Sequence, residues 1–410
     1  MKLPQPTTVR FDSGLRLVHL QHHNVGAGIF GIVISAGSSD ESAADEGLAH
    51  FVEHTIFKGT QKRSSWHVIN RMESVGGELN AFTTKEETTV YSIFPSGNAA
   101  RAIELIADLA LNSRFPEREL EKEREVVLDE IYSYRDTPSE AVFDDFEDLV
   151  FKGSPLGHNI LGTPESVARL SSEDCRGFLG RYYYTTNVVA FYSGPENAAR
   201  ISKLVEKHFA AMRSEKHRQE RAASVFVPAN KSVELCGLHQ SHVVLGMSAS
   251  SFFSDRKYAD SLFSNMIGGP GMNSLLNVEL RERRGLVYNV ESAVDHFSST
   301  GLLTVYFGCD AEDTDRCIRI CKETLGRLAE MPEGELSRLL VRAKRQYSGQ
   351  RAVASENREN RIIACARAML YMDKIAGDDA VSERINAVSK DDIRALAAQM
   401  SVPSSLIMHP

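Results

Sequence analysis

The chain has 410 residues, of which 42% are hydrophobic and 25% are charged, a composition typical of a soluble globular protein. This length exceeds what one compact core holds and suits two domains of about two hundred residues each. The formal net charge of -8, from 47 basic and 55 acidic residues, gives no basic field for binding nucleic acid or an anionic membrane.

The N-terminal residues, the apolar stretches and the cysteines limit the class of protein further. The first residues, MKLPQPTTVRFDSG, lack the apolar core of a signal peptide, and no later stretch approaches the roughly 18 apolar residues of a membrane span. We therefore expect a cytoplasmic protein. The six cysteines are scattered without a C-x-x-C pair, which argues against a disulfide framework and against a thiolate zinc site.

The first informative element is a helix predicted in DEGLAHFVEHTIFKGT. We expect Asp45 and Glu46 in its first turn and Gly59 at its end. Its apolar residues recur at helical spacing and predict one buried stripe, formed by Leu48, Phe51, Val52 and Ile56.

This helix carries an unusual group of polar residues. His50 and His54 are four residues apart and therefore project from one face, with Glu53 on nearly the same stripe. The pattern indicates a chelate for a metal ion. The alternative is that these are ordinary surface residues of a helix, and a third ligand is needed to decide between the two interpretations.

A second helix, predicted in EKEREVVLDEIYSYRDTP, offers carboxylates for that role. We expect Val126, Val127 and Ile131 to be buried, with Glu123 and Glu130 seven residues apart on a common face. Taken alone, these glutamates are typical of solvated charges. A metal site with two histidines nevertheless commonly recruits a carboxylate.

Near the midpoint, the charged stretch 213–224 predicts a linker between domains at 1–212 and 225–410. The two halves share a pattern: TVYSIFPSGNAARAIELIADL from Thr89 and TVYFGCDAEDTDRCIRICKETL from Thr304 align without gaps, with arginines at Arg101 and Arg316. Each segment predicts a strand, a turn and an amphipathic helix. Two unrelated segments of similar pattern are the alternative, but we favour two homologous α/β halves.

The second half lacks the polar group of the first. Where its counterpart of the HFVEH helix is expected, residues 260–265 read DSLFSN, without histidine or glutamate. This asymmetry favours a single metal site in the chain, confined to the first half.

Together these motifs resemble the pitrilysin-like inverzincin metallopeptidases, in particular the short subfamily that includes the mitochondrial processing peptidase. Their signature is H-x-x-E-H followed by a distant glutamate ligand, and Glu130 lies 76 residues after His54. The resemblance implies one zinc ion (Zn²⁺) per chain, bound by His50, His54 and Glu130. It also implies that Glu123 supports this site without binding the metal, and that Glu53 is the general base.

The resemblance extends to the substrate-binding elements. GGELNAFTTKEETTVY looks like the edge strand of the family, in which Asn80 and Ala81 would bind the backbone of the substrate. GGPGMNSLLNVELRERRGLVYNV looks like its glycine-rich turn and R-x6-Y element. The resemblance therefore implies that Arg281 and Tyr288 bind substrate and stabilise the tetrahedral intermediate.

As a whole, the resemblance implies an α+β fold of two homologous α/β-roll domains, each a largely antiparallel sheet covered by helices. The implied function is a zinc-dependent endopeptidase that hydrolyses short or unfolded peptides inside a chamber formed by two subunits of a homodimer. The alternative is a catalytically silent scaffold, or a partner subunit of a hetero-oligomeric peptidase. Such a protein would have no reason to keep the complete set of site residues.

Overall fold

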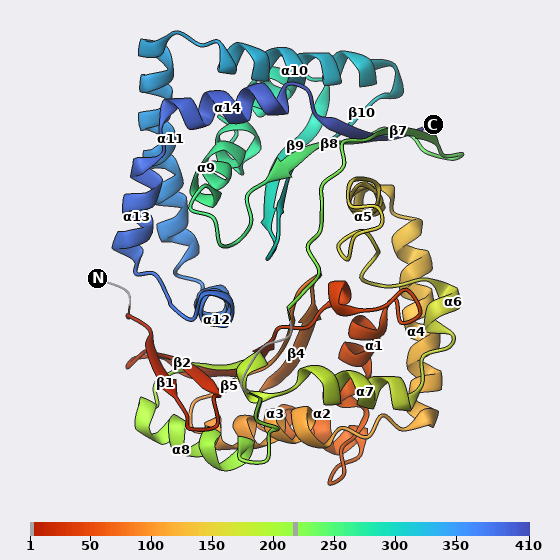
Figure 1. Ribbon diagram of the computed structural model, residues 1–410, viewed down its shortest axis with the longest axis vertical. Helices are drawn as coiled ribbons and strands as arrows, with labels where there is room; N and C mark the ends of the chain where they lie inside the picture. The colour runs from red at the N-terminus through yellow and green to blue at the C-terminus, as the bar shows by residue number, and fades with distance from the viewer. Residues whose placement is uncertain (1–3, 216–219) are drawn as a thin grey trace. The chain divides into compact units, whose positions relative to one another are not determined.

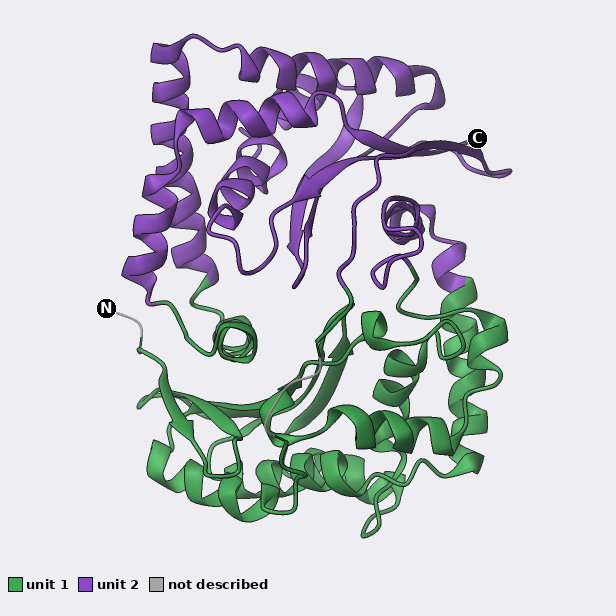
Figure 2. Ribbon diagram, viewed as in Figure 1, with its two compact units in different colours: residues 1–132, 158–222, 355–376 green, residues 133–157, 223–354, 377–410 purple. Residues whose placement is uncertain are grey.

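A computed structural model of the chain describes residues 4–215 and 220–410. Figure 2 colours the two compact units into which the chain divides. Unit 1 comprises residues 1–132, 158–222 and 355–376, and unit 2 comprises residues 133–157, 223–354 and 377–410.

These units differ from the predicted domains, which were continuous in sequence. Residues 133–157 of the first half pack within unit 2, and residues 355–376 of the second half pack within unit 1. The predicted linker, 213–224, falls partly on residues 216–219, which lie outside the described residues.

Unit 1 is a six-stranded sheet with helices on both faces (Figure 1). Its strands are β1 (Thr7–Arg10), β2 (Arg16–Gln21), β3 (Ala27–Ile34), β4 (Glu78–Thr83), β5 (Thr88–Pro95) and β6 (Val188–Gly194). Its helices are η1 (Ser38–Asp40), α1 (Leu48–Thr55), η2 (Ile56–Lys58), α2 (Ser65–Glu73), α3 (Ala99–Asn112), α4 (Glu117–Arg135, which ends in unit 2), α6 (Pro164–Val167), α7 (Ser172–Tyr182), η3 (Thr185–Asn187), α8 (Ala198–Phe209) and α12 (Arg358–Met372).

The sheet of unit 1 has the strand order β1-β2-β6-β3-β5-β4. All neighbours are antiparallel except β2 and β6, which are parallel. Helices α1, α3, α7 and α8 cover one face and bury the larger apolar core of the unit. Strand β4 ends the sheet, so among the described strands it pairs with β5 alone.

Unit 2 contains a five-stranded sheet. Its strands are β7 (Asn230–Glu234), β8 (Ser241–Ala249), β9 (Val287–His296), β10 (Gly301–Cys309) and β11 (Ser404–His409). Its helices are α5 (Pro138–Val150), α9 (Lys257–Gly268), η4 (Asn277–Glu282), η5 (Ala311–Asp313), α10 (Thr314–Ala329), α11 (Glu333–Ala354), α13 (Asp378–Ala387) and α14 (Lys390–Met400).

The two sheets share one topology. The order β7-β11-β8-β10-β9 repeats the order β2-β6-β3-β5-β4 strand for strand. The parallel pairs are also equivalent: β2 with β6 in unit 1 and β7 with β11 in unit 2. The aligned segments from Thr89 and Thr304 fall on the equivalent strands β5 and β10. The predicted α+β fold of two homologous domains is therefore confirmed.

Equivalent helices are exchanged between the units. Helix α12 packs Ile362, Ala366 and Leu370 on the outer face of the unit 1 sheet, against residues such as Val189 and Phe191. Each buried aliphatic side chain of this kind contributes about 1.5–3 kcal/mol. These contacts join segments far apart in the sequence, which is why the compact units do not coincide with the two halves of the chain.

Helix α5 covers the corresponding face of the unit 2 sheet, and there it requires a glycine. A Cβ atom built on Gly246 of β8 would lie 2.5 Å from Cε1 of Phe146, a fully buried residue of α5. The absence of a side chain at Gly246 therefore allows the aromatic ring to lie directly on the strand. None of the helices in the described part of the chain combines the length and apolarity needed to cross a membrane.

Candidate metal centre

The centre is built on α1, which begins later than predicted. Asp45 and Glu46 precede the helix, whose N-cap is Gly47 in the left-handed region at φ +88°. The chain must make this turn because it passes close to another loop: a Cβ on Gly47 would lie 2.7 Å from the carbonyl oxygen of Leu161. The predicted stripe of Leu48, Phe51, Val52 and Ile56 is buried, as expected.

A carboxylate that the sequence did not reveal caps this helix. The side chain of Glu41 is fully buried, and it accepts hydrogen bonds from the amides of Gly47 at 2.8 Å and Ala49 at 2.6 Å. His158 Nε2 lies 3.3 Å from the same carboxylate, and burial raises the pKa of Glu41. Because these bonds hold the amide next to His50, Glu41 fixes the start of the helix that carries the predicted ligands.

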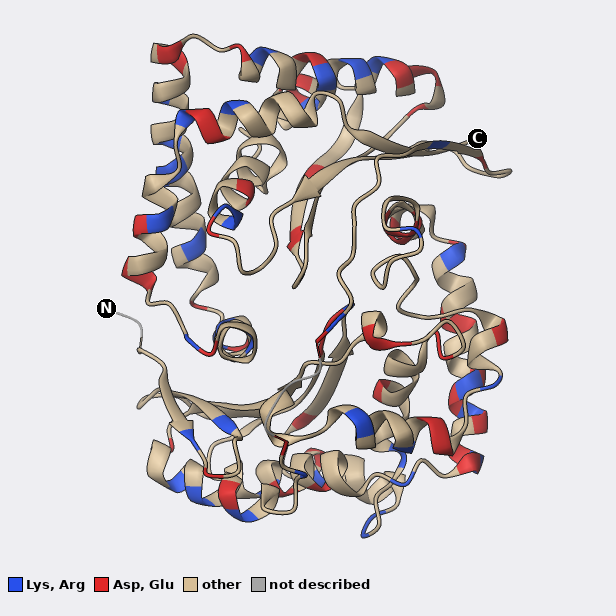
Figure 3. Cartoon of the chain, in the orientation of Figure 1, with Lys and Arg blue, Asp and Glu red and all other residues tan. Residues whose placement is uncertain are grey.

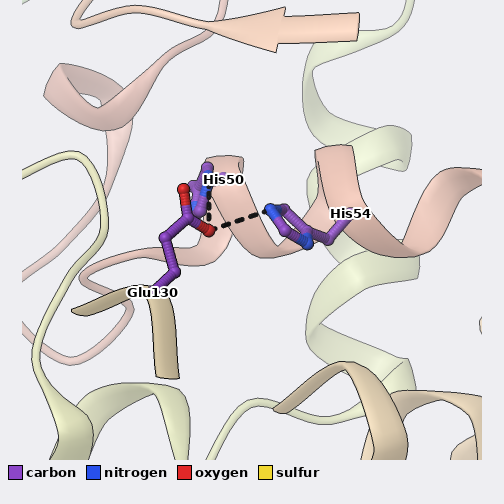
Figure 4. Close-up of side chains that lie close together, drawn as sticks. All are labelled: His50, His54 and Glu130. Carbon is purple, nitrogen blue, oxygen red and sulfur yellow. Dashed lines mark ion pairs between the residues drawn. The ribbon is translucent and has the colours of Figure 1, made fainter. Parts of the chain in front are cut away.

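His50, His54 and Glu130 converge at one point (Figure 4). Glu130 Oε2 lies 3.7 Å from His50 Nε2 and 3.3 Å from His54 Nε2. In a tetrahedral zinc site with metal–ligand bonds near 2.05 Å, ligand atoms are separated by about 3.3 Å. Both distances are close to that separation, and all three ligand atoms lie within 4.8 Å of one another, so the cluster could hold a metal ion.

The protonation of these groups also suits a metal ion. Burial and the neighbouring His54 lower the pKa of His50 to about 4, so this imidazole is neutral with a free lone pair at pH 7. The hydrogen bond from His54 lowers the pKa of Glu130, which is therefore anionic. Burial acts to lower the pKa of His54, but its interactions with Glu130, Glu53 and Glu123 raise it overall. A cation bound here would replace the proton that those carboxylates favour.

Helix α4 supplies both acidic residues from one face. Glu123 lies behind the cluster, with Oε2 3.5 Å from His54 Nδ1. A carboxylate in this position orients a ligating imidazole so that its other nitrogen faces the metal. Lys58 holds the second oxygen of Glu123 at 2.6 Å. Lys58 was not predicted, although it lies four residues after His54 on the continuing helical turn.

The prediction that three apolar residues of α4 are all buried is wrong for one of them. Val127 and Ile131 are buried, but Val126 is 49% exposed. Successive residues of a helix point about 100° apart, so Val126 and Val127 cannot both face the core.

Glu53 lies between the cluster and the sheet edge. It is half-buried, and burial raises its pKa while the adjacent Thr83 opposes the shift. Thr83 is the last residue of β4, which also carries Asn80 and Ala81 opposite Tyr91 and Val90 of β5. The carboxylate of Glu53 is thus next to a strand whose outer edge no described strand pairs with.

Arg281 and Tyr288 form a pair in unit 2. Arg281 lies in η4, a π-helical segment, and its guanidinium carbon is 5.7 Å from the centre of the Tyr288 ring. Tyr288 is 86% exposed, so it is not part of the core. Arg281 also lines a pocket of about 240 Å³ together with Pro270 and Asn289.

Comparison with known proteins connects these features. Residues 17–164 match the model described as insulinase (peptidase family M16), and residues 169–341 match the model described as the peptidase M16 inactive domain. A relative named uncharacterized zinc protease, from Streptomyces coelicolor, is 32% identical over 94% of this chain and 84% of its own length. The chain belongs to peptidase family M16. The predicted resemblance is thereby confirmed.

Other relatives of this M16 family member are likewise named uncharacterized zinc proteases. The Bacillus subtilis protein is 30% identical over 95% of this chain and 94% of its own length. Two solved structures share the fold. A protease from Helicobacter pylori superposes with a TM-score of 0.88 at 21% identity and covers 100% of both chains. A peptidase M16 inactive domain from Pseudomonas fluorescens has a TM-score of 0.89 at 16% identity and covers 98% of this chain and 97% of its own.

Proposed function

We propose that the protein is a zinc-dependent endopeptidase that hydrolyses short or unfolded peptides. The observation that carries this proposal is the convergence of two imidazole nitrogens and a carboxylate oxygen at zinc-ligand spacing, with Glu53 on the same helix. His50, His54 and Glu130 would hold one zinc ion per chain. That ion supplies Lewis-acid chemistry and lowers the pKa of a water molecule toward neutrality.

Glu53 performs the proton transfers in this proposal. Its carboxylate takes a proton from the water that attacks the peptide carbonyl and then donates it to the leaving amine. The raised pKa of Glu53 suits this role, because a base whose pKa approaches the working pH both accepts and returns a proton efficiently. Arg281 and Tyr288 would bind the substrate and donate to the developing oxyanion.

The edge of β4 defines the substrate class. An extended peptide added beside Asn80 and Ala81 would form main-chain hydrogen bonds that do not depend on its side chains. A helix or a packed domain does not expose its backbone in this way. The proposed substrates are therefore short or unfolded peptides.

Replacing Glu53 by glutamine tests the assignment. We expect turnover of a quenched fluorescent peptide to fall by about 10²-fold or more, because a general base contributes at least that much. Zinc content and thermal unfolding should stay at wild-type values. Hydrolysis that survives the change would remove Glu53 as the base. Wild-type protein that holds zinc but cleaves no peptide mixture, with or without another chain, would favour the scaffold alternative.

We also propose that the active form is a homodimer with two composite sites. Its support is the distribution of residues: the metal ligands belong to unit 1, whereas Arg281 and Tyr288 belong to unit 2. The family resemblance implies that the zinc of one subunit would face the Arg/Tyr pair of the other across the chamber. We propose no binding to nucleic acid or to a membrane. The predicted cytoplasmic location is tested by cell fractionation.

Complementation tests the composite site. A Glu53→Gln chain is coexpressed with an Arg281→Ala/Tyr288→Phe chain, each nearly inactive alone. Mixed dimers would contain one intact site, and random pairing should restore roughly a quarter of wild-type activity, since half the dimers have one site of two. Absence of recovery in verified mixed dimers would contradict the shared site.

A further inference from the structure

A groove in unit 2 follows one side of α11 and has no role in the chemistry above. It encloses about 740 Å³ and is lined by Pro270 of the glycine-rich turn and by residues of the last turns of α11. Its polar groups are Arg342, Arg345, Gln346 and Gln350, and its lining contains no carboxylate. Arg342 and Arg345 therefore give the groove two positive charges, and its other lining residues are uncharged.

Arg342 and Arg345 have no acidic partner in the described part of the chain. Both are exposed, they lie three residues apart on the helix, and neither forms an ion pair with any residue the structure describes. Figure 3 shows the basic residues of the chain in blue and the acidic residues in red. Positions one turn away from them are Arg338, Leu339, Val341, Gln346, Ser348 and Gly349, none of which is acidic. Like charges at this spacing destabilise a helix, and no contact with a described residue offsets this effect.

Two other arginines of the same unit are neutralised by one carboxylate. Arg283 and Arg284 place their guanidinium groups 2.5 Å and 2.6 Å from the carboxylate of Glu279. In a chain with a net charge of -8, Arg342 and Arg345 place two positive charges, which no described residue pairs, in a groove whose lining has no acid. Guanidinium groups are good donors to a carboxylate, so a carboxylate of a ligand is the group that this groove would favour.

The wall of the groove is fixed and open. Gln346 exchanges hydrogen bonds with Asn273 at 2.8 Å and 3.1 Å, and Gln350 accepts one from Asn265 at 2.8 Å. The two bonds of Asn273 hold the glycine-rich turn against α11, and the bond of Asn265 joins α9 to α11. Gly349 lies inside the helix, where glycine costs about 1 kcal/mol relative to alanine. A Cβ there would meet nothing within 4 Å, so packing does not require this glycine, but its absence of a side chain leaves the groove open.

The groove continues from the pocket that contains Arg281. Pro270 lines both of them, so the glycine-rich turn forms their common border. A peptide bound beside Arg281 and extending past Pro270 would enter the groove that Arg342 and Arg345 line. Val353, which is 76% exposed, adds an apolar contact at the far end of the same wall.

We propose that this groove is a specificity subsite that binds an aspartate or glutamate side chain of the peptide held at Arg281. The inference rests on the proposed peptidase function and adds the charge of the preferred substrate. Two exposed ion pairs of ordinary strength are expected to favour the acidic peptide by roughly two- to thirtyfold in kcat/KM. The preference should decline with added salt.

The experiment uses the zinc-loaded full chain and quenched fluorescent peptides of one sequence. A single glutamate is moved through the positions on both sides of the scissile bond, and each peptide is compared with its glutamine counterpart. All peptides are amidated at the C-terminus, so the terminal carboxylate is not a source of the effect. Free-acid versions in a parallel arm show whether a terminal carboxylate is bound instead, which would overturn the assignment to a side chain.

The test variant is Arg342→Gln/Arg345→Gln. It should lose the preference for glutamate while cleaving the glutamine peptide at the wild-type rate. The matched control is Arg316→Gln/Arg319→Gln on α10, which removes two exposed arginines at the same spacing and should keep the preference. Arg345→Glu supplies a second test, because it should reverse the preference toward a lysine peptide. Thermal unfolding verifies that each variant is folded.

The outcomes separate this inference from the proposed function. Wild-type protein that cleaves the glutamine peptides but prefers glutamate at no position overturns the subsite and leaves the peptidase assignment intact. A preference that both double variants retain, or both lose, also overturns it. If no peptide is cleaved, fluorescence anisotropy of labelled glutamate and glutamine peptides on the wild-type protein decides the question, because tighter binding of glutamate that requires Arg342 and Arg345 supports the subsite without any turnover.

Discussion

Replacing Glu41 by alanine should loosen the start of α1 and weaken zinc binding at the same time. The substitution leaves the amides of Gly47 and Ala49 without their acceptor, and Ala49 is fully buried. Hydrogen bonds to a charged group contribute about 1.5–3 kcal/mol each. The cost of burying Glu41, which raises its pKa, and the ordering of its side chain offset part of this gain, leaving an expected loss of about 2–4 kcal/mol.

The measurement has to distinguish local from global unfolding. Hydrogen exchange of the amides of 48–55 in zinc-free protein reports the opening free energy of α1, and urea unfolding reports that of the chain. Zinc affinity, measured by competition with a chelator, should fall with the stability of α1, because an opened helix separates His50 from His54. Glu41→Gln keeps one acceptor oxygen and should lose about half as much.

A matched control lies in the same loop. Asp45 accepts a hydrogen bond from Ser42 in an exposed position, so Asp45→Ala should change stability by no more than about 0.5 kcal/mol. If Glu41→Ala protein matches this control in amide exchange and in zinc affinity, the buried carboxylate does not fix the helix and the reasoning is refuted.

Three further predictions concern the ligands and the core. His54→Ala should lose most of its zinc by elemental analysis, and retention at wild-type occupancy would mean that the ligand set is wrong. Glu123→Gln should weaken zinc binding by about 10- to 100-fold in chelator competition, because it removes the carboxylate that orients His54; unchanged affinity would remove that role. Gly246→Ala should destabilise the protein by about 1–3 kcal/mol in urea unfolding, since its Cβ would lie 2.5 Å from Phe146. Phe146→Leu should reduce that penalty, and strict additivity of the two changes would argue against the contact.

Several features of the site follow from local periodicity. The spacing of His50, Glu53 and His54 places them on one face of any helix, and the same rule predicted the buried stripe that begins at Leu48. Glu130 was identified by resemblance, because spacing alone did not distinguish a ligand from a solvated charge. The errors of this reasoning are also local: Val126 was assigned to the core although it is 49% exposed, and α1 begins after Asp45 and Glu46.

The sequence by itself determined the repeat, the helical faces and the residue types of the metal centre, because these depend on covalent spacing and backbone geometry. Only the tertiary structure showed Glu41 beneath α1 and Lys58 against Glu123, because a hydrogen bond between separate elements has no fixed sequence interval. The exchange of α5 and α12 between the units was decided at the same level. Each of these helices has an apolar face, and an apolar face alone does not specify which of the two described sheets it covers. Long-range packing, such as that of Phe146 on Gly246, decides this.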